Sequence, residues 1–65
     1  MIMEKTYRFK RVLKNGTFFF SSLGFNGISQ AFTFAHQTAL NELDVYCVDV
    51  YDDDMLLARF FRVVY

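Results

Sequence analysis

Apolar residues between positions 28 and 43 recur every three or four residues, which is the spacing of one face of an α-helix. This apolar stripe consists of Ile28, Ala31, Phe32, Ala35, Ala39 and Leu43. At about 100° per residue, the opposite side of the helix gathers Gln30, Thr33, Gln37 and Asn41, and Phe34 falls among these polar residues. The pattern predicts an amphipathic helix over Ile28 to Leu43 that carries one aromatic side chain on its solvent side.

Before the helix, Asn15-Gly16 separates two segments with strand character, Lys5 to Lys14 and Thr17 to Leu23. Asn-Gly is a strong hairpin signal because both residues tolerate the positive φ that a two-residue turn requires. We therefore expect a hairpin whose two-residue loop pairs Lys14 with Thr17.

This register decides which side chains share a face of the hairpin, because side chains alternate along a strand. It places Phe18 and Phe20 on the same face as Phe9, toward the helix. It places Phe19 on the opposite face, beside Arg8 and Lys10.

After the helix, the apolar period changes from three or four residues to two, which is typical of a strand. Tyr46, Val48 and Val50 alternate with Val45, Cys47, Asp49 and Tyr51. The acidic triplet from Asp52 to Asp54 predicts a turn, because Asp side chains bond to their own backbone in turns. The segment from Met55 to Tyr65 is rich in aromatic and β-branched residues, which favours a strand over a helix.

These elements predict one α+β domain over residues 1–65. Its expected order is ββαββ: an antiparallel-rich four-stranded sheet with one helix packed on one face. The other face of such a sheet is either open to solvent or covered by another molecule.

The composition is unusually apolar for a chain of this length. Of the 65 residues, 54% are hydrophobic and 20% aromatic, including nine Phe, and there is no Pro. A domain this small buries only about 60% of its unfolded surface, so surplus apolar surface is expected to remain exposed. A homodimer or a partner protein would cover this surface most simply.

The net charge is zero, but the two signs are separated along the chain. Residues 1–14 carry five cations against Glu4 alone, whereas residues 42–54 carry six carboxylates and no cation. The simpler interpretation is that a basic and an acidic segment lie side by side in one sheet and attract each other. The alternative is that each segment offers a charged patch to a partner.

The sequence contains no motif of a catalytic or metal site. Three consecutive Asp residues do not have the alternating ligand spacing of a calcium loop. His36 and Cys47 could form a nucleophilic or metal-binding pair, but no third group is placed to orient them. The glycines match neither a phosphate loop nor a dinucleotide fingerprint. We therefore expect a protein that is not an enzyme and that holds no metal or cofactor.

The sequence also indicates a location. Cys47 is the single cysteine, so an internal disulfide is excluded, as is common in a reducing compartment. The first residues do not resemble a secretory leader, and no stretch approaches the roughly 20 apolar residues of a membrane span. The expectation is a cytoplasmic protein without a membrane segment.

Two surface features suggest binding. Phe34 between Gln30 and Gln37 resembles an aromatic anchor ringed by polar groups, as in a protein interface. Phe19 between Arg8 and Lys10 could instead stack bases and neutralise phosphates of a single-stranded nucleic acid.

Nucleic-acid-binding domains usually carry a clear cationic excess, and this chain has none. The sequence therefore favours binding to another protein and leaves single-stranded nucleic acid as the alternative. For a protein partner the candidate contacts are Gln30, Phe34, Gln37, Arg8, Lys10 and Phe19, whereas the nucleic-acid alternative uses the hairpin face with Arg8, Lys10 and Phe19.

The layout resembles that of small phage-encoded proteins that block host defence or metabolism, such as anti-CRISPR proteins, antitoxin-like inhibitors and inhibitors of host polymerase. The resemblance covers a short one-domain chain with one cysteine, the Asn15-Gly16 hairpin, a helix containing Ser29 to His36, and a closing pair of strands. It implies a non-enzymatic inhibitor that occludes the working surface of a host protein in the host cytoplasm. Many such inhibitors mimic DNA with strong negative charge, and the zero net charge here departs from that pattern.

Overall fold

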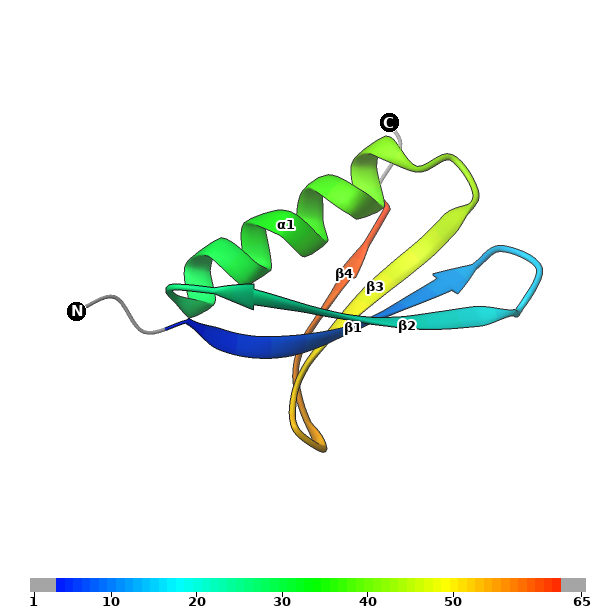
Figure 1. The fold of residues 1–65 in the computed structure, drawn as a ribbon. Coiled ribbons are helices and arrows are strands. Elements are labelled where there is room, and N and C mark those ends of the chain that lie inside the picture. Colours follow the sequence, from blue (N-terminus) through cyan, green and yellow to red (C-terminus); the bar gives the residue numbers. More distant parts are fainter. Residues whose placement is uncertain (1–3, 63–65) are drawn as a thin grey trace.

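A computed structural model describes residues 4–62 as four strands and one helix (Figure 1). The elements are β1 (Lys5–Leu13), β2 (Phe18–Phe25), α1 (Ile28–Asn41), β3 (Val45–Asp52) and β4 (Met55–Phe61). The strands form one sheet in the order β2-β1-β3-β4, and every neighbouring pair is antiparallel. The predicted ββαββ order and α+β class are confirmed. Residues 63–65, at the end of the predicted fourth segment, lie outside the described residues.

The helix packs on one face of the sheet through its small residues (Figure 1). Ala31, Ala35 and Ala39 are fully buried, and they belong to the same core cluster as Phe9 and the β3 valines. Because alanine adds little bulk, the helix backbone can lie close to the sheet at its centre. Larger rings fill the space at the two sides of the helix. Phe34 contacts Phe9 on the β1 side, and Phe32 contacts Phe60 on the β4 side.

The helix begins at Ile28, as predicted, but ends two residues earlier than predicted. It stops at Asn41, so Leu43 lies in the loop before β3, where 70% of its surface is exposed. Ile28 is the first helical residue and is 46% exposed, because the end of a helix has fewer neighbours to cover it. Both residues were predicted to be core and both predictions are wrong, whereas Thr38, which was not predicted, is buried.

The hairpin between β1 and β2 forms at Asn15-Gly16, but its loop is one residue longer than predicted. Leu13 N–H donates to the Thr17 carbonyl at 2.8 Å, and Gly16 N–H donates to the Leu13 carbonyl at 3.0 Å. Gly16 has φ +91°, as expected where a type I turn is followed by one left-handed residue. The Asn15 side chain strengthens this turn by accepting from Thr17 N–H at 3.0 Å.

The longer loop shifts the register of β2 by one residue, so the predicted faces of β2 are wrong. Arg11 pairs with Phe19, and Phe9 pairs with Ser21. Phe19 therefore lies on the helix side of the sheet. Phe18 and Phe20 lie on the opposite side, where Phe19 was expected.

The basic and acidic segments lie side by side, as the simpler interpretation of the charge pattern predicted. β1 pairs with β3, and Lys5 Nζ lies 2.6 Å from Asp52 Oδ2 across this pair. The acidic triplet forms the predicted turn between β3 and β4, with Asp53 at φ +52°. Asp tolerates this left-handed conformation better than most residues do.

Candidate binding surface

The side of the sheet opposite α1 is here called the open face, because no element of residues 4–62 packs over it (Figure 1). Strand alternation assigns to it Arg8, Lys10, Val12, Phe18, Phe20, Cys47, Asp49, Tyr51, Arg59 and Phe61. Three of its rings remain about half exposed: Phe18 at 53%, Phe20 at 48% and Phe61 at 46%. The open face is thus a broad aromatic surface in contact with solvent.

Cations of β1 stack on the exposed rings of β2. The Arg8 guanidinium carbon lies 4.6 Å from the centre of the Phe20 ring, and Lys10 Nζ lies 4.5 Å from the centre of the Phe18 ring. The two rings meet edge to face with their centres 5.8 Å apart. Such contacts contribute about 0.5–1 kcal/mol each at exposed sites. They hold these long side chains in place before any ligand binds.

An ion pair between the buried Asp49 carboxylate and the half-exposed Arg59 lies next to these rings. The Asp49 carboxylate is 1% exposed and accepts two bonds from Arg59, Nε to Oδ1 at 2.7 Å and Nη2 to Oδ2 at 3.1 Å. These bonds and the negative charge of Asp49 raise the pKa of Arg59. With Arg8 and Lys10, the open face carries three cations against two carboxylates, Asp49 and the Glu4 carboxylate over Gly24, so its net charge is positive.

Cys47 also belongs to the open face, but it is buried, and its Sγ lies 3.9 Å from Asp49 Oδ1. Burial raises the pKa of this thiol, and the charge of Asp49 raises it further. His36 lies on α1 beside Phe60, on the other side of the sheet. His36 and Cys47, which the sequence offered as a nucleophilic or metal-binding pair, therefore lie on opposite sides of the sheet. Within residues 4–62, no three His, Cys, Asp or Glu side chains are grouped so that they could hold a metal ion.

The predicted contact residues fall in different places. Arg8 and Lys10 lie on the open face, as predicted, but Phe19 lies on the helix side and Phe18 and Phe20 take its place. This correction follows from the one-residue shift of the hairpin register.

The predicted contacts on the helix do not form one surface. Phe34 is half-buried, and its ring centre lies 5.1 Å from that of Phe9 and 5.6 Å from that of Phe25. Its predicted position on the solvent side is wrong, because rings on the neighbouring strands extend far enough to cover it. Gln30 is exposed and accepts a bond from Asn26 N–H at 3.2 Å, which links the first turn of the helix to the loop before it.

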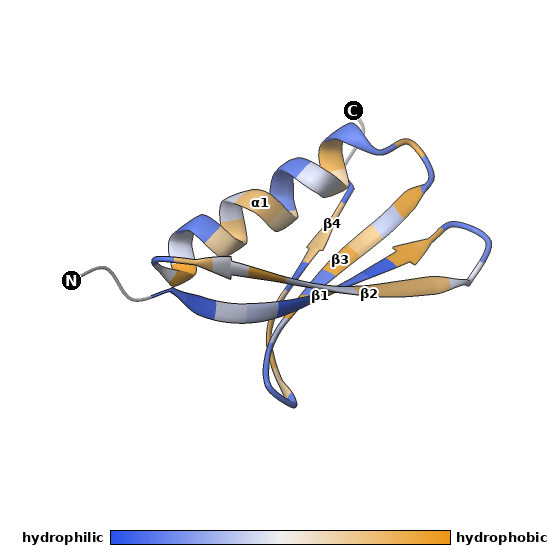
Figure 2. Cartoon of the chain, viewed as in Figure 1, coloured by the Kyte–Doolittle hydropathy of each residue, from blue (hydrophilic) through white to orange (hydrophobic). Residues whose placement is uncertain are grey.

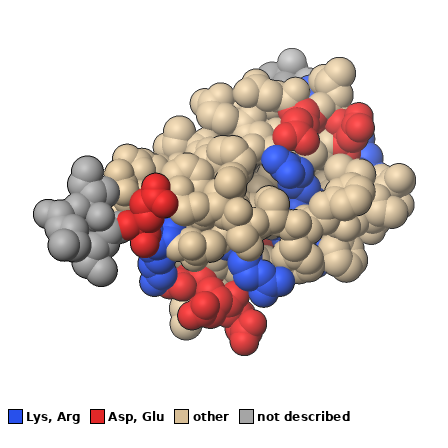
Figure 3. Space-filling view, in the orientation of Figure 1, with Lys and Arg blue, Asp and Glu red and all other residues tan. Residues whose placement is uncertain are grey.

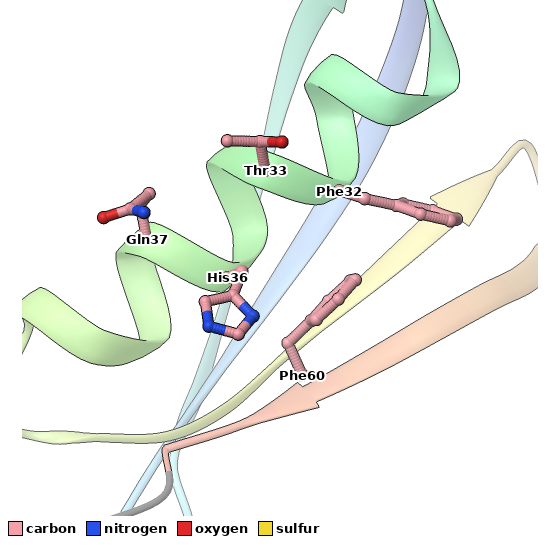
Figure 4. Close-up of a pocket in the computed structure, with 5 residues that line it drawn as sticks. All are labelled: Phe32, Thr33, His36, Gln37 and Phe60. Atoms are coloured by element: carbon pink, nitrogen blue, oxygen red, sulfur yellow. The ribbon is translucent and has the colours of Figure 1, made fainter.

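Gln37 borders a shallow hollow between α1 and β4, together with Phe32, Thr33, His36 and Phe60 (Figure 4). The rings of Phe32 and Phe60 lie side by side with His36 next to Phe60, whereas Thr33 and Gln37 point away from them. The hollow has a volume of about 300 Å³ and opens widely to solvent. His36 is its one titratable group, so the hollow lacks the paired groups that acid–base or nucleophilic chemistry needs.

The acidic side chains gather away from the aromatic cluster. Figure 3 shows one group over the turn between β3 and β4, another over the loop between α1 and β3, and a third acidic patch near the start of β1. Residues in the first two groups are Asp52, Asp53, Asp54, Glu42 and Asp44. The open face itself carries two carboxylates, Asp49 and Glu4, and the Glu4 carboxylate lies over Gly24.

Several residues of the open face were not predicted as contacts from the sequence, namely Phe18, Phe20, Tyr51 and Arg59. Once the register is known, the alternation of side chains along β1 and β2 places Phe18 and Phe20 on the same face as Arg8 and Lys10. The pairing of Arg59 with Asp49 follows from the neighbouring positions of β3 and β4.

The helix α1, with 14 residues, is too short to cross a membrane, and it is the one helix among residues 4–62. No family model, curated protein or solved structure matches this chain.

Proposed function

We propose that this chain is a non-enzymatic protein-binding module that uses its open face to bind another protein. The observation that carries this proposal is that Phe18 and Phe20 on one outer strand and Phe61 on the other are all about half exposed on an uncovered sheet face that also carries Arg8 and Arg59. Aromatic residues and Arg are enriched in the cores of protein interfaces, whereas Asp, Glu and Lys are depleted there. We thus keep protein binding as the proposed role, but we assign the contact surface to the open face of the sheet and not to the helix.

The charge of the open face indicates the chemistry of the partner. Three cations against two carboxylates leave a net positive charge, which fits a partner surface that combines apolar side chains with exposed carboxylates. Because Arg8 and Lys10 already stack on rings, binding would order few additional side chains. Occlusion of a host protein by such a face is the inhibitory role that the resemblance to small phage proteins implies. The non-enzymatic part of the proposal is supported by the separation of His36 from Cys47.

The proposal is tested by capture with paired variants. Immobilised wild-type protein and the double variant Arg8→Ala, Phe20→Ala would be exposed to the same nuclease-treated lysate, and the captured proteins compared by quantitative mass spectrometry. A matched control is Leu43→Ala, which removes an exposed apolar side chain from the loop before β3.

We expect one protein to be captured by the wild type and by the Leu43 variant and to be lost with the open-face variant. Titration of that purified protein should then show an affinity at least about tenfold weaker for Arg8→Glu. Equal capture by all three proteins would contradict the assignment of the open face.

Single-stranded nucleic acid is a second candidate because cations and exposed rings alternate on the open face. Rings can stack bases while Arg8 and Lys10 neutralise phosphates. This function predicts binding to labelled single-stranded oligonucleotides that weakens steeply with salt and with Lys10→Glu. If anisotropy shows such binding while no protein is captured, nucleic acid replaces protein as the partner.

A further inference from the structure

The outer strand β2 is an unusual edge, because none of its eight residues, Phe18 to Phe25, is charged or Pro. Natural sheets usually protect an edge with charges, Pro or a bulge, since its unpaired backbone groups can bind another strand. The other outer strand, β4, has such protection: it contains Arg59, and its pairing with β3 shifts register at Val50/Tyr51. β2 pairs with β1 without any shift, and its first residues are strongly apolar (Figure 2).

The hairpin geometry identifies the backbone groups of β2 that point outward. The bond from Leu13 N–H to the Thr17 carbonyl makes these residues a hydrogen-bonded pair. In an antiparallel ladder such pairs alternate with pairs whose backbone groups point away from the partner. The outward groups therefore belong to Phe18, Phe20, Ser22 and Gly24.

We propose that β2 pairs in antiparallel fashion with β2 of a second copy of this chain, about a two-fold axis at Ser21. In this register Phe20 lies opposite Ser22, and Phe18 lies opposite Gly24. Each outward backbone group then meets an outward group of the other copy. Opposed residues of an antiparallel pair lie on the same side of the sheet, so both helices lie on one side. The two open faces join into one continuous surface on the other side.

Charges on the open face complement each other in this dimer. Glu4 lies directly over Gly24: its Oε1 is 2.7 Å from the position that a Cβ on Gly24 would occupy. The ring that comes opposite Gly24 is Phe18 of the second copy, and Lys10 Nζ lies over that ring at 4.5 Å. The pairing thus brings Glu4 of each copy toward Lys10 of the other.

A second copy fits this edge better than it fits the open face. Stacking of two open faces would bring together two surfaces that each carry a net positive charge, which is unfavourable. Pairing of β2 with β2 of a second copy places no like charges opposite each other, because β2 has no charged residue.

The first test removes one outward N–H from the edge. Ser22→Pro deletes an amide that does not bond to β1, so the hairpin is expected to persist, whereas Ser22→Ala keeps the amide and serves as the control. Purified wild-type and Ser22→Ala proteins should sediment as dimers, and Ser22→Pro should dimerise at least about tenfold more weakly. Circular dichroism would verify that the proline variant is folded.

The second test exchanges the charges of the proposed ion pair. Glu4→Lys and Lys10→Glu should each weaken the dimer, and the double variant should restore it, because the attraction is re-formed with reversed sign. If the proline variant does not fold, the charge variants alone test the proposed dimer. A wild-type monomer at all concentrations, or a dimer that neither the proline nor the charge variants weaken, would overturn the proposal. These measurements use the purified chain alone, so they do not depend on the proposed protein partner.

Discussion

Arg59 and Asp49 form a two-point ion pair across β3 and β4, with Nε of Arg59 2.7 Å from Oδ1 of Asp49. This pair explains how a carboxylate that is only 1% exposed can lie on the side of the sheet opposite the helix. A buried carboxylate without partners would be costly, and the planar guanidinium satisfies both of its oxygens. The pair also fixes Arg59 at a defined position on the open face.

We predict that Arg59→Gln lowers the stability of the fold, because it leaves the Asp49 charge buried without a cation bonded to it. The urea midpoint should fall clearly, and Asp49→Asn added to the Arg59 variant should recover part of the loss. Arg62→Gln is the control, since Arg62 bonds to the Glu42 carbonyl and not to a buried charge. Similar midpoints for the Arg59 and Arg62 variants would show that the buried pair contributes little.

Gly16 and Gly27 provide a matched test of the hairpin turn. Neither glycine has an atom within 4 Å of the position that a Cβ would occupy, so Ala at either site would meet no neighbour. Gly16 has φ +91°, which disfavours Ala, whereas Gly27 has φ −153°, which any residue adopts. We expect Gly16→Ala to reduce the unfolding free energy by about 1 kcal/mol and Gly27→Ala to reduce it by less, the latter because Ala is less favourable than Gly at the N-cap of α1. Chemical denaturation would measure both, and equal effects would contradict the left-handed turn.

Phe34 and Phe19 allow a similar comparison for the core. Phe34 packs against Phe9 and Phe25, whereas Phe19 is 58% exposed. Phe34→Ala should therefore cost about 2 kcal/mol of unfolding free energy, below the value for a fully buried ring, and Phe19→Ala about 0.5 kcal/mol or less. A larger loss from Phe19→Ala than from Phe34→Ala would place Phe34 on the surface, as its position in the helix pattern first indicated.

The sequence predicts the elements of this fold well, because each has a clear periodicity. The repeat of Ala31, Ala35 and Ala39 indicates the helix, and the alternation around Val48 indicates β3. The hairpin register could not be predicted in the same way. Asn15-Gly16 suits both a two-residue loop and a three-residue loop, since each needs Gly at positive φ.

The consecutive rings of Phe18, Phe19 and Phe20 explain why the faces of β2 were ambiguous. A run of three apolar residues supplies an apolar side chain to both faces, so the hydrophobic pattern does not choose between the two registers. The candidate surface was only partly predictable for the same reason. Arg8 and Lys10 were assigned correctly by alternation along one strand, whereas the Arg59–Asp49 pair depends on which strands are neighbours.

Cys47 gives a prediction that depends on pH. The thiol is buried, and both burial and the nearby Asp49 carboxylate raise its pKa above that of a free thiol. A raised pKa means that the folded protein keeps this proton at pH values where the unfolded chain has lost it. The contribution of the Cys47 proton to the unfolding free energy is therefore fully present at pH values below the pKa of the thiol in the unfolded chain. It decreases as the pH rises toward and through the pKa of the thiol in the folded protein.

The thiolate is the reactive form of cysteine, so Cys47 should react more slowly in the folded protein than in the unfolded chain. Iodoacetamide should modify the folded protein on the order of tenfold more slowly than the urea-unfolded chain at the same mildly alkaline pH. Mass spectrometry of samples quenched over time measures both rates. Asp49→Asn removes one cause of the raised pKa and should speed the reaction of the folded protein, whereas Asp53→Asn, in the exposed turn, should not. Equal rates for the folded and unfolded chains would mean that the thiol is neither buried nor held in its protonated form.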